Sequence, residues 1–223
     1  MASRLPLRKR LARFLAVLCV VTVPLAAWMA WSARGDAEAE VARMAELFEL
    51  KPGMTVGEIG AGNGKMTVAM SRLLGPEGKV YSSDLNTERV ADIRTAVTDR
   101  GLENVEVIEG RTAETDFPPA CCDGIFMSKV YHHFTDPATM NRSLMNSLQP
   151  GGRLAIIDFE PTGWQLWLGH PEGVPENRGG HGITRSLVVS ELTEAGFEIE
   201  HEIPGWWGGP FGRFCVIARK PAD

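Results

Sequence analysis

A glycine-rich turn near the first third of the chain has the spacing of a ligand-binding loop. Gly60, Gly62 and Gly64 directly follow an apolar run over residues 54–59 and precede a helical pattern. Without side chains, such a turn lets the backbone approach a ligand at the start of a helix, where amide groups point outward. The pattern alone is a weak signal for a nucleotide site. It predicts a cofactor site that includes Gly60, Ala61, Gly62, Asn63 and Gly64.

Two acidic residues extend this pattern. Glu58 could hold the turn through its amides or interact with the cationic amino group of an amino-acid ligand, and its alternative is a turn-stabilising acid. Asp84 lies twenty residues beyond Gly64, where a carboxylate can accept both ribose hydroxyls of an adenosine; its alternative is a helix N-cap. Lys65 stands where the dinucleotide pattern has its third glycine, so NAD and FAD fit less well.

The elements that must position these residues alternate between short apolar runs and helical patterns. Strands are predicted over residues 54–59, 79–83, 105–108, 124–127, 153–158, 197–203 and 213–218. Helices are predicted over residues 36–50, 65–74, 87–99, 138–148 and 186–195, with an irregular loop over residues 160–182. This alternation predicts an α/β domain over residues 36–223, with a mostly parallel sheet and helices on both faces.

The first 35 residues have a different character. Phe14–Trp31 is a run of eighteen uncharged residues preceded by five basic ones. As a helix it would reach about 27 Å, close to the hydrocarbon thickness of a bilayer. We therefore expect a single-pass N-terminal membrane anchor, with a cleaved export signal as the alternative. The positive-inside rule places the α/β domain on the side of the membrane away from the cytoplasm.

Charge and cysteine content restrict the classes of partner. Six of the 23 basic residues lie in residues 1–35, which contain no acid, so the remaining chain carries 17 basic and 28 acidic residues, a net charge near −11. Such a domain lacks the basic surface of a nucleic-acid-binding protein. The four cysteines show no zinc-ligand spacing, and we expect no metal. Cys121 and Cys122 are interpreted as small buried side chains, with a reactive vicinal pair as the alternative.

Five segments in the right order resemble class I methyltransferases that use S-adenosylmethionine (SAM). Residues 56–64 resemble their first motif, and Asp84 resembles the acid that binds ribose. Residues 110–114 are similar to the segment that contacts adenine, although Arg111 and Thr112 stand where many relatives have an acid. Residues 123–134 resemble the fourth motif, and residues 148–154 resemble the entry to the fifth strand.

The resemblance covers about 170 residues and implies a Rossmann-like, seven-stranded, mostly parallel sheet with an antiparallel last strand. It implies that SAM lies across the carboxyl ends of the strands. It is closest in character to quinone-pathway and general small-molecule methyltransferases. The implied cofactor contacts beyond the turn are Glu58, Asp84, Ala113, Glu114 and Ser128.

Methyl transfer from a sulfonium needs alignment, and a base only where the acceptor must lose a proton. Tyr131, His132 and His133 follow the predicted fourth strand and are the candidate bases, with capping or packing as the alternative. Asp158, at the end of the fifth strand, is a further candidate. His170 and His181 are interpreted as solvated.

We expect residues 160–182 and a tryptophan pair, Trp206 and Trp207, to build the acceptor pocket. Together with Trp164 and Trp167 they could line a pocket for an aromatic, cationic or lipid-like molecule, or instead cover the sheet or touch the bilayer. The predicted function is methyl transfer to a small-molecule or membrane-associated acceptor. The alternative is a SAM-binding sensor or assembly protein without catalysis. SAM is made in the cytoplasm, so the predicted topology and the predicted cofactor conflict.

Overall fold

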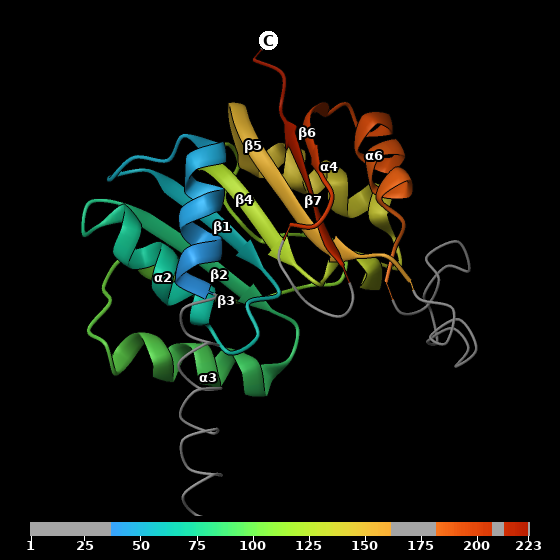
Figure 1. The fold of residues 1–223 in the computed structure, drawn as a ribbon. Coiled ribbons are helices and arrows are strands. Elements are labelled where there is room, and N and C mark those ends of the chain that lie inside the picture. The colour runs from blue at the N-terminus through green and yellow to red at the C-terminus, as the bar shows by residue number, and fades with distance from the viewer. Residues whose placement is uncertain (1–36, 162–181, 207–211, 223) are drawn as a thin grey trace, which may run out of the picture.

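The computed structural model describes residues 37–161, 182–206 and 212–222. A seven-stranded sheet runs through this part of the chain in the order β3-β2-β1-β4-β5-β7-β6 (Figure 1). The strands are β1 (Thr55–Ile59), β2 (Lys79–Asp84), β3 (Val105–Glu109), β4 (Cys122–Ser128), β5 (Leu148–Phe159), β6 (Glu198–Ile203) and β7 (Arg213–Arg219). β1 to β5 are parallel, and β7 runs antiparallel to both β5 and β6. The expected Rossmann-like sheet is confirmed.

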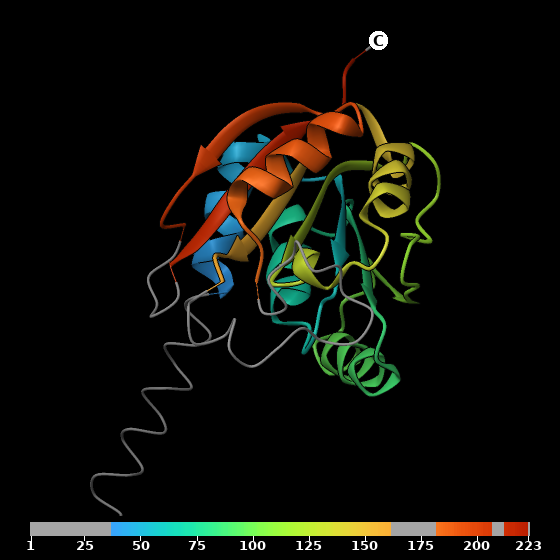
Figure 2. The ribbon, with the colours of Figure 1, turned by 90° about the vertical axis from the view of Figure 1, so that its right-hand side faces the viewer.

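Helices cover both faces of the sheet. On one face lie the helix over residues 37–48, α2 (Lys65–Leu74) and α3 (Thr87–Thr98), which bury Met44, Met70 and Ile93. On the other face lie α4 (Pro137–Ser147) and α6 (Arg185–Glu194), seen from their side in Figure 2. The strands that separate these layers are apolar on both sides, as expected of a mostly parallel sheet.

The strand order reverses between β1 and β4, because the chain leaves β1 toward β2 and β3 and later returns to β4 on the other side. At such a point the loops after the two strands diverge and leave a crevice at their carboxyl ends. The glycine turn follows β1, and a short 3₁₀ helix, η1 (Tyr131–His133), follows β4. The fold therefore brings the predicted cofactor turn and the predicted bases to one edge of the sheet.

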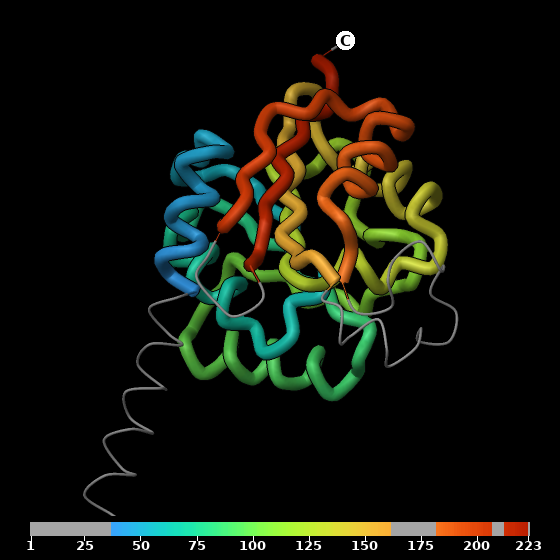
Figure 3. Tube along the Cα trace, turned by 45° about the vertical axis from the view of Figure 1, so that its right-hand side comes forward, coloured from blue at the N-terminus to red at the C-terminus, as the bar shows by residue number. Residues whose placement is uncertain are grey.

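The helix over residues 37–48 is held to the end of the sheet formed by β6 and β7 through a buried polar cluster. Trp206 is 1% exposed, and its indole Nε1 donates to Glu40 Oε1 over 2.8 Å. Arg213 donates to the same carboxylate over 2.8 Å, and the guanidinium carbon of Arg43 lies 4.2 Å from the centre of the Trp206 ring. Figure 3 shows the helix over residues 37–48 beside β6 and β7. Trp206 thus covers the sheet and does not line an acceptor pocket. Trp164, Trp167 and Trp207 lie outside the described residues.

Several element boundaries differ from the prediction. β5 begins at Leu148, directly after α4, whereas a turn over residues 150–152 was expected to separate helix and strand. Leu148 pairs with Cys122, and a register shift before Gly124 absorbs the intervening residues, so both strands start earlier than predicted. The helix at Tyr131–His133 was not predicted.

The apolar run Phe14–Trp31 lies outside the described residues, as do His170 and His181. Among the helices of the described residues, none is long and apolar enough to cross a bilayer. The membrane anchor therefore remains a prediction from the sequence.

The cysteines of the described region are reduced. Cys122 and Cys215 are buried, as the hydrophobic interpretation expected, and Cys121 is half-buried. The sulfur atoms of Cys121 and Cys122 lie 3.0 Å apart. The hydrogen bond between them lowers the pKa of the Cys121 thiol and raises that of Cys122. The vicinal pair is therefore close in space, with only one thiol reachable from solvent.

Candidate cofactor and active site

The turn after β1 depends on glycine for both backbone angle and space. Gly60, Gly62 and Gly64 have φ values of 71°, 58° and 70°, a left-handed conformation that side chains other than glycine strain. A Cβ at Gly60 would also collide with the side chain of Val130, whereas Gly62 has open space around it. Gly64 begins α2 without a side-chain cap. The turn is thus shaped for close approach of a ligand to its backbone.

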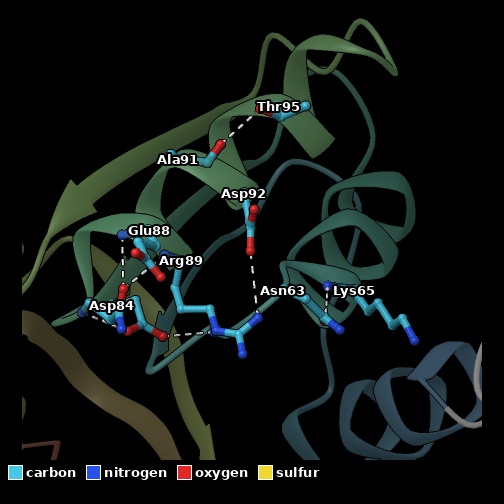
Figure 4. Close-up of polar contacts among 10 residues, drawn as sticks. Asn63, Lys65, Asp84, Glu88, Arg89, Ala91, Asp92 and Thr95 are labelled. Atoms are coloured by element: carbon cyan, nitrogen blue, oxygen red, sulfur yellow. Dashed lines mark hydrogen bonds and ion pairs between the residues drawn. The ribbon is translucent and has the colours of Figure 1, made fainter.

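Asp84 and the end of β2 hold this turn. The amides of Gly60 and Ala61 donate to the Ser83 carbonyl over 2.8 and 2.9 Å. One Asp84 carboxylate oxygen accepts the Gly62 amide over 2.8 Å, and the other accepts the amide of Asn86 over 3.0 Å. Figure 4 shows Asp84 beside the start of α3. Asp84 does not cap this helix, because the Asn86 side chain does so by accepting the amides of Glu88 and Arg89.

Glu58 does not hold the turn through its amides, contrary to one of its two predicted roles. It is 4% exposed and accepts a hydrogen bond from the Thr67 hydroxyl of α2 over 2.5 Å. The same hydroxyl lies 2.8 Å from Ser82 of β2. Burial, and secondarily the nearby charge of Asp84, raise the pKa of Glu58 to about 8 despite the hydrogen bond from Thr67. Glu58 is therefore part of a buried polar cluster beneath α2.

A cavity of about 270 Å³ opens between these strand ends. Four predicted site residues line it, namely Gly60, Asp84, Glu114 and His133. Its other walls include Gly110, Arg111 and Thr112 of the segment that resembles the adenine contact. The remaining lining residues are Ile59, Ser83, Leu85, Val130, Phe134 and Thr135. A larger cavity of about 430 Å³ lies behind the turn, between α2, α3 and the helix over residues 37–48. The smaller one is the candidate site because it lies at the carboxyl ends of β1, β2 and β4.

The remaining predicted cofactor residues lie around this cavity without lining it. Asn63 and Gly64 line the larger cavity instead. Ala113 is half-buried next to Glu114, and Glu114 forms an ion pair with Arg111 over 2.9 Å. Ser128 is half-buried at the end of β4.

Leu85 is a residue that sequence reasoning missed. It is 57% exposed and lines the cavity directly after Asp84. A large apolar side chain at the exit of a strand, before a helix cap, could have indicated a surface that a ligand covers.

The three candidate bases differ in burial and in the residues that they contact. Tyr131 is fully buried in the core and accepts a hydrogen bond from Asn141 over 2.8 Å, so it is not presented to the cavity. His133 is exposed and lines the cavity. His132 is 5% exposed, with Nδ1 2.8 Å from Asp158 Oδ1, and its ring centre lies 3.9 Å from that of His133. His132 and Asp158 thus form a buried pair that is separated from the cavity by the ring of His133.

These residues fit an adenosine-containing cofactor. The cavity combines the backbone of Gly60, the carboxylate of Asp84 and the exposed apolar surface of Leu85. A carboxylate at this strand end can accept ribose hydroxyls, and an apolar side chain can pack against a base.

Comparisons with known proteins agree with this geometry. Residues 57–156 match the family described as "Methyltransferase domain". The ubiquinone/menaquinone biosynthesis C-methyltransferase UbiE of Vibrio campbellii is 33% identical over 110 residues, which are 49% of this chain and 42% of that protein. The protein of the same name from Hahella chejuensis is 31% identical over 115 residues, 51% of this chain and 46% of that protein. The matched region spans less than half the length of these curated relatives.

Solved structures match over more of the chain. A SAM-dependent methyltransferase from Aquifex aeolicus superposes with a TM-score of 0.65 and 28% identity, covering 81% of this chain and 89% of that one. The [4+2]-cyclase SpnF superposes with a TM-score of 0.68 at 17% identity, covering 83% and 82%, which shows a shared fold alone. The sheet order, the turn around Gly60 and these matches together support a class I SAM-dependent methyltransferase domain, with SAM as its cofactor.

Proposed function

We propose that this chain is an enzyme that transfers a methyl group from SAM to a small-molecule acceptor. The observation that carries the proposal is the cavity at the strand ends, where Gly60 and Asp84 form one wall and His133 forms another. When bound, SAM supplies an activated methyl group on a positively charged sulfur. The protein's part is to bind and align the reactants and to exclude water.

Different sides of the cavity would contact the cofactor and the acceptor. The glycine turn and Asp84 present backbone and carboxylate to the cofactor. Val130 and Phe134 form the apolar side next to η1. The acceptor would enter from the carboxyl ends of β4 and β5, where Lys129, His132 and Asp158 lie. The chain thereby keeps cofactor recognition on β1 and β2 and acceptor chemistry on β4 and β5.

For the acceptor, the curated relatives suggest a class. They are named as C-methyltransferases of ubiquinone and menaquinone biosynthesis. We propose a quinol-like or lipid-like aromatic molecule for this chain, which also agrees with the predicted N-terminal membrane segment. Naphthalene-1,4-diol is a simple water-compatible probe of this class.

The test is formation of S-adenosylhomocysteine by the full chain with SAM and naphthalene-1,4-diol. We expect turnover that depends on both compounds and on Asp84, with Asp99→Asn as an exposed acidic control. Stoichiometric SAM binding together with no methylation of any acceptor from the membrane extract of the source cells would contradict catalysis. It would instead favour the second candidate, a SAM-binding protein that acts without methyl transfer. The cyclase neighbour supports keeping that candidate, because its name shows that this fold is not restricted to methyl transfer.

A further inference from the structure

A buried histidine–aspartate pair lies next to His133, which lines the cavity. Asp158 is 0% exposed and lies near the carboxyl end of β5, while His132 lies in the 3₁₀ helix that follows β4. Nδ1 of His132 lies 2.8 Å from Asp158 Oδ1 and 3.0 Å from Oδ2. Asp158 lies in β5 and His132 follows β4, the parallel neighbour of β5, so the sheet brings the two residues to the same edge.

The other contacts of Asp158 determine which ring nitrogen of His132 donates to it. Its carboxylate accepts the backbone amides of His132 over 3.1 Å and of Phe159 over 3.0 Å. A buried carboxylate that accepts several N–H groups acts as an ionised acceptor. The Nδ1 atom of His132 must therefore donate to it, so in the neutral imidazole the lone pair is on Nε2. Nε2 is therefore the ring nitrogen that can take up a proton.

The surroundings hold the imidazole in one orientation next to the site. Its ring centre lies 3.9 Å from that of His133, which lines the cavity, and 5.0 Å from that of Phe159 in an edge-to-face arrangement. Lys129, three residues earlier, has a left-handed backbone with φ 60°, and its amide donates a hydrogen bond to the Ile157 carbonyl over 2.7 Å. Backbone strain at a residue other than glycine is concentrated at functional sites, and this one fixes the path from β4 into η1.

We propose that His132 is the general base of methyl transfer, that Asp158 is its positioning residue, and that the acceptor is a phenol or enol that reacts after losing a hydroxyl proton. This inference rests on the proposed function and adds the substrate class and two residue roles to it. In the step, the acceptor hydroxyl proton moves to Nε2 of His132. The acceptor oxygen, or the ring carbon beside it, forms the new bond to the methyl carbon. The methyl–sulfur bond breaks and its electron pair stays on sulfur, so charge and atoms balance.

Two features favour a phenol or enol over an ammonium or an aliphatic alcohol. Asp158 already accepts three donors, so it is committed to His132 and offers little to a cationic acceptor, and exposed Lys129 adds a positive charge to the same strand exit. A histidine base is matched to a proton whose acidity is near neutrality, which phenols approach and aliphatic alcohols do not. Asp158 from β5 and His133 from the same 3₁₀ helix are titratable groups that contact His132.

The first experiment needs no turnover. The full chain is saturated with S-adenosylhomocysteine and titrated with 4-nitrophenol, whose visible absorbance reports its ionisation. We expect the bound dye to ionise at lower pH than the free dye. His132→Gln should abolish this difference and Asp158→Asn should reduce it, while His201→Gln on exposed β6 should leave it unchanged.

The second experiment measures rates with naphthalene-1,4-diol as the acceptor. His132→Gln and Asp158→Asn should each lower kcat by about 10²–10⁴-fold, while the Kd for SAM stays within about twofold. Asp158→Asn should also change the pH profile of kcat, which a purely structural effect would not do.

The outcomes separate the two proposals. Retained kcat in His132→Gln, or a wild-type complex that neither binds nor ionises 4-nitrophenol, would overturn this inference while leaving SAM binding intact. Faster methylation of benzylamine than of the diol would overturn the acceptor class. Absence of SAM binding by the wild-type chain would instead overturn the proposed function itself.

Discussion

At the scale of single residues, the site depends on positions where a side chain is either absent or unusually buried. Gly60 and Gly62 share a left-handed backbone, but only Gly60 is pressed against Val130. Glu58 is a carboxyl group with no solvent around it, directly beneath the turn. Each of these positions leads to a prediction about the free energy of unfolding that is independent of activity.

Substitution of the two glycines by alanine separates backbone strain from crowding. Gly62→Ala should cost about 1–2 kcal/mol in the free energy of unfolding, the penalty of a left-handed backbone. Gly60→Ala should cost about 1–3 kcal/mol more, because its Cβ also meets Val130. Urea unfolding measures both values. The extra cost should shrink in a Val130→Ala background, and an equal cost at both glycines would show that the close contact is not there.

The raised pKa of Glu58 makes stability depend on pH. In the unfolded chain the Glu58 carboxyl has its ordinary pKa of 4.5, whereas its pKa in the folded protein is about 8. The folded protein thus holds the proton more tightly, and stability falls as the pH rises from about 4.5 to about 8, by a few kcal/mol in total. Glu58→Gln keeps an acceptor for Thr67 and should remove this fall. Thermal melts across this pH range measure this fall in stability, with exposed Glu77→Gln as the control. Parallel curves for wild type and Glu58→Gln would show that Glu58 does not cause it.

At the scale of elements, the sequence predicted the seven strands and the helices on both faces because their apolar periodicities are strong. It also placed the glycine turn and Asp84 at adjacent strand ends. It missed that β5 starts directly at the end of α4, since the pairing of Leu148 with Cys122 is a tertiary contact that outweighs the local Pro-Gly-Gly signal. It could not separate Tyr131, His132 and His133, because a 3₁₀ turn spaces successive side chains about 120° apart and the sequence does not state which one faces the core.

The attachment of the helix over residues 37–48 could not be predicted from the sequence either, because Glu40 and Arg213 are far apart in the chain. Glu40→Ala should cost about 3–5 kcal/mol, since it leaves Arg213 and the Trp206 indole without their buried acceptor. Glu38→Ala, two residues earlier, should cost at most about 1 kcal/mol because its 3.8 Å ion pair with Arg72 is exposed. Chemical denaturation measures the free energy of unfolding of both variants. Similar losses would mean that the buried cluster stabilises the fold no more than the exposed ion pair does.

At the scale of the whole molecule, the α/β domain carries the family resemblance and the first 35 residues carry a separate prediction. We expect the run Phe14–Trp31 to keep the full chain in the membrane fraction after alkaline carbonate extraction. Release into the soluble fraction with a shortened mass would support the cleaved export signal instead.

The side of the membrane is a further prediction at this scale. The basic residues before Phe14 predict that a C-terminal reporter is active only outside the cytoplasm. Reporter activity in the cytoplasm would contradict that topology and would remove the conflict with the supply of SAM.

The central claim is that the cavity between Gly60 and Asp84 binds SAM, and calorimetry on the full chain tests it most directly. We expect one SAM per chain, weaker binding in Asp84→Asn by about 1–3 kcal/mol, and unchanged binding in the exposed control Asp99→Asn. NAD should give no comparable heat. A correctly folded wild-type chain that binds NAD but not SAM, or an Asp84→Asn variant with unchanged SAM affinity, would contradict SAM binding at this cavity.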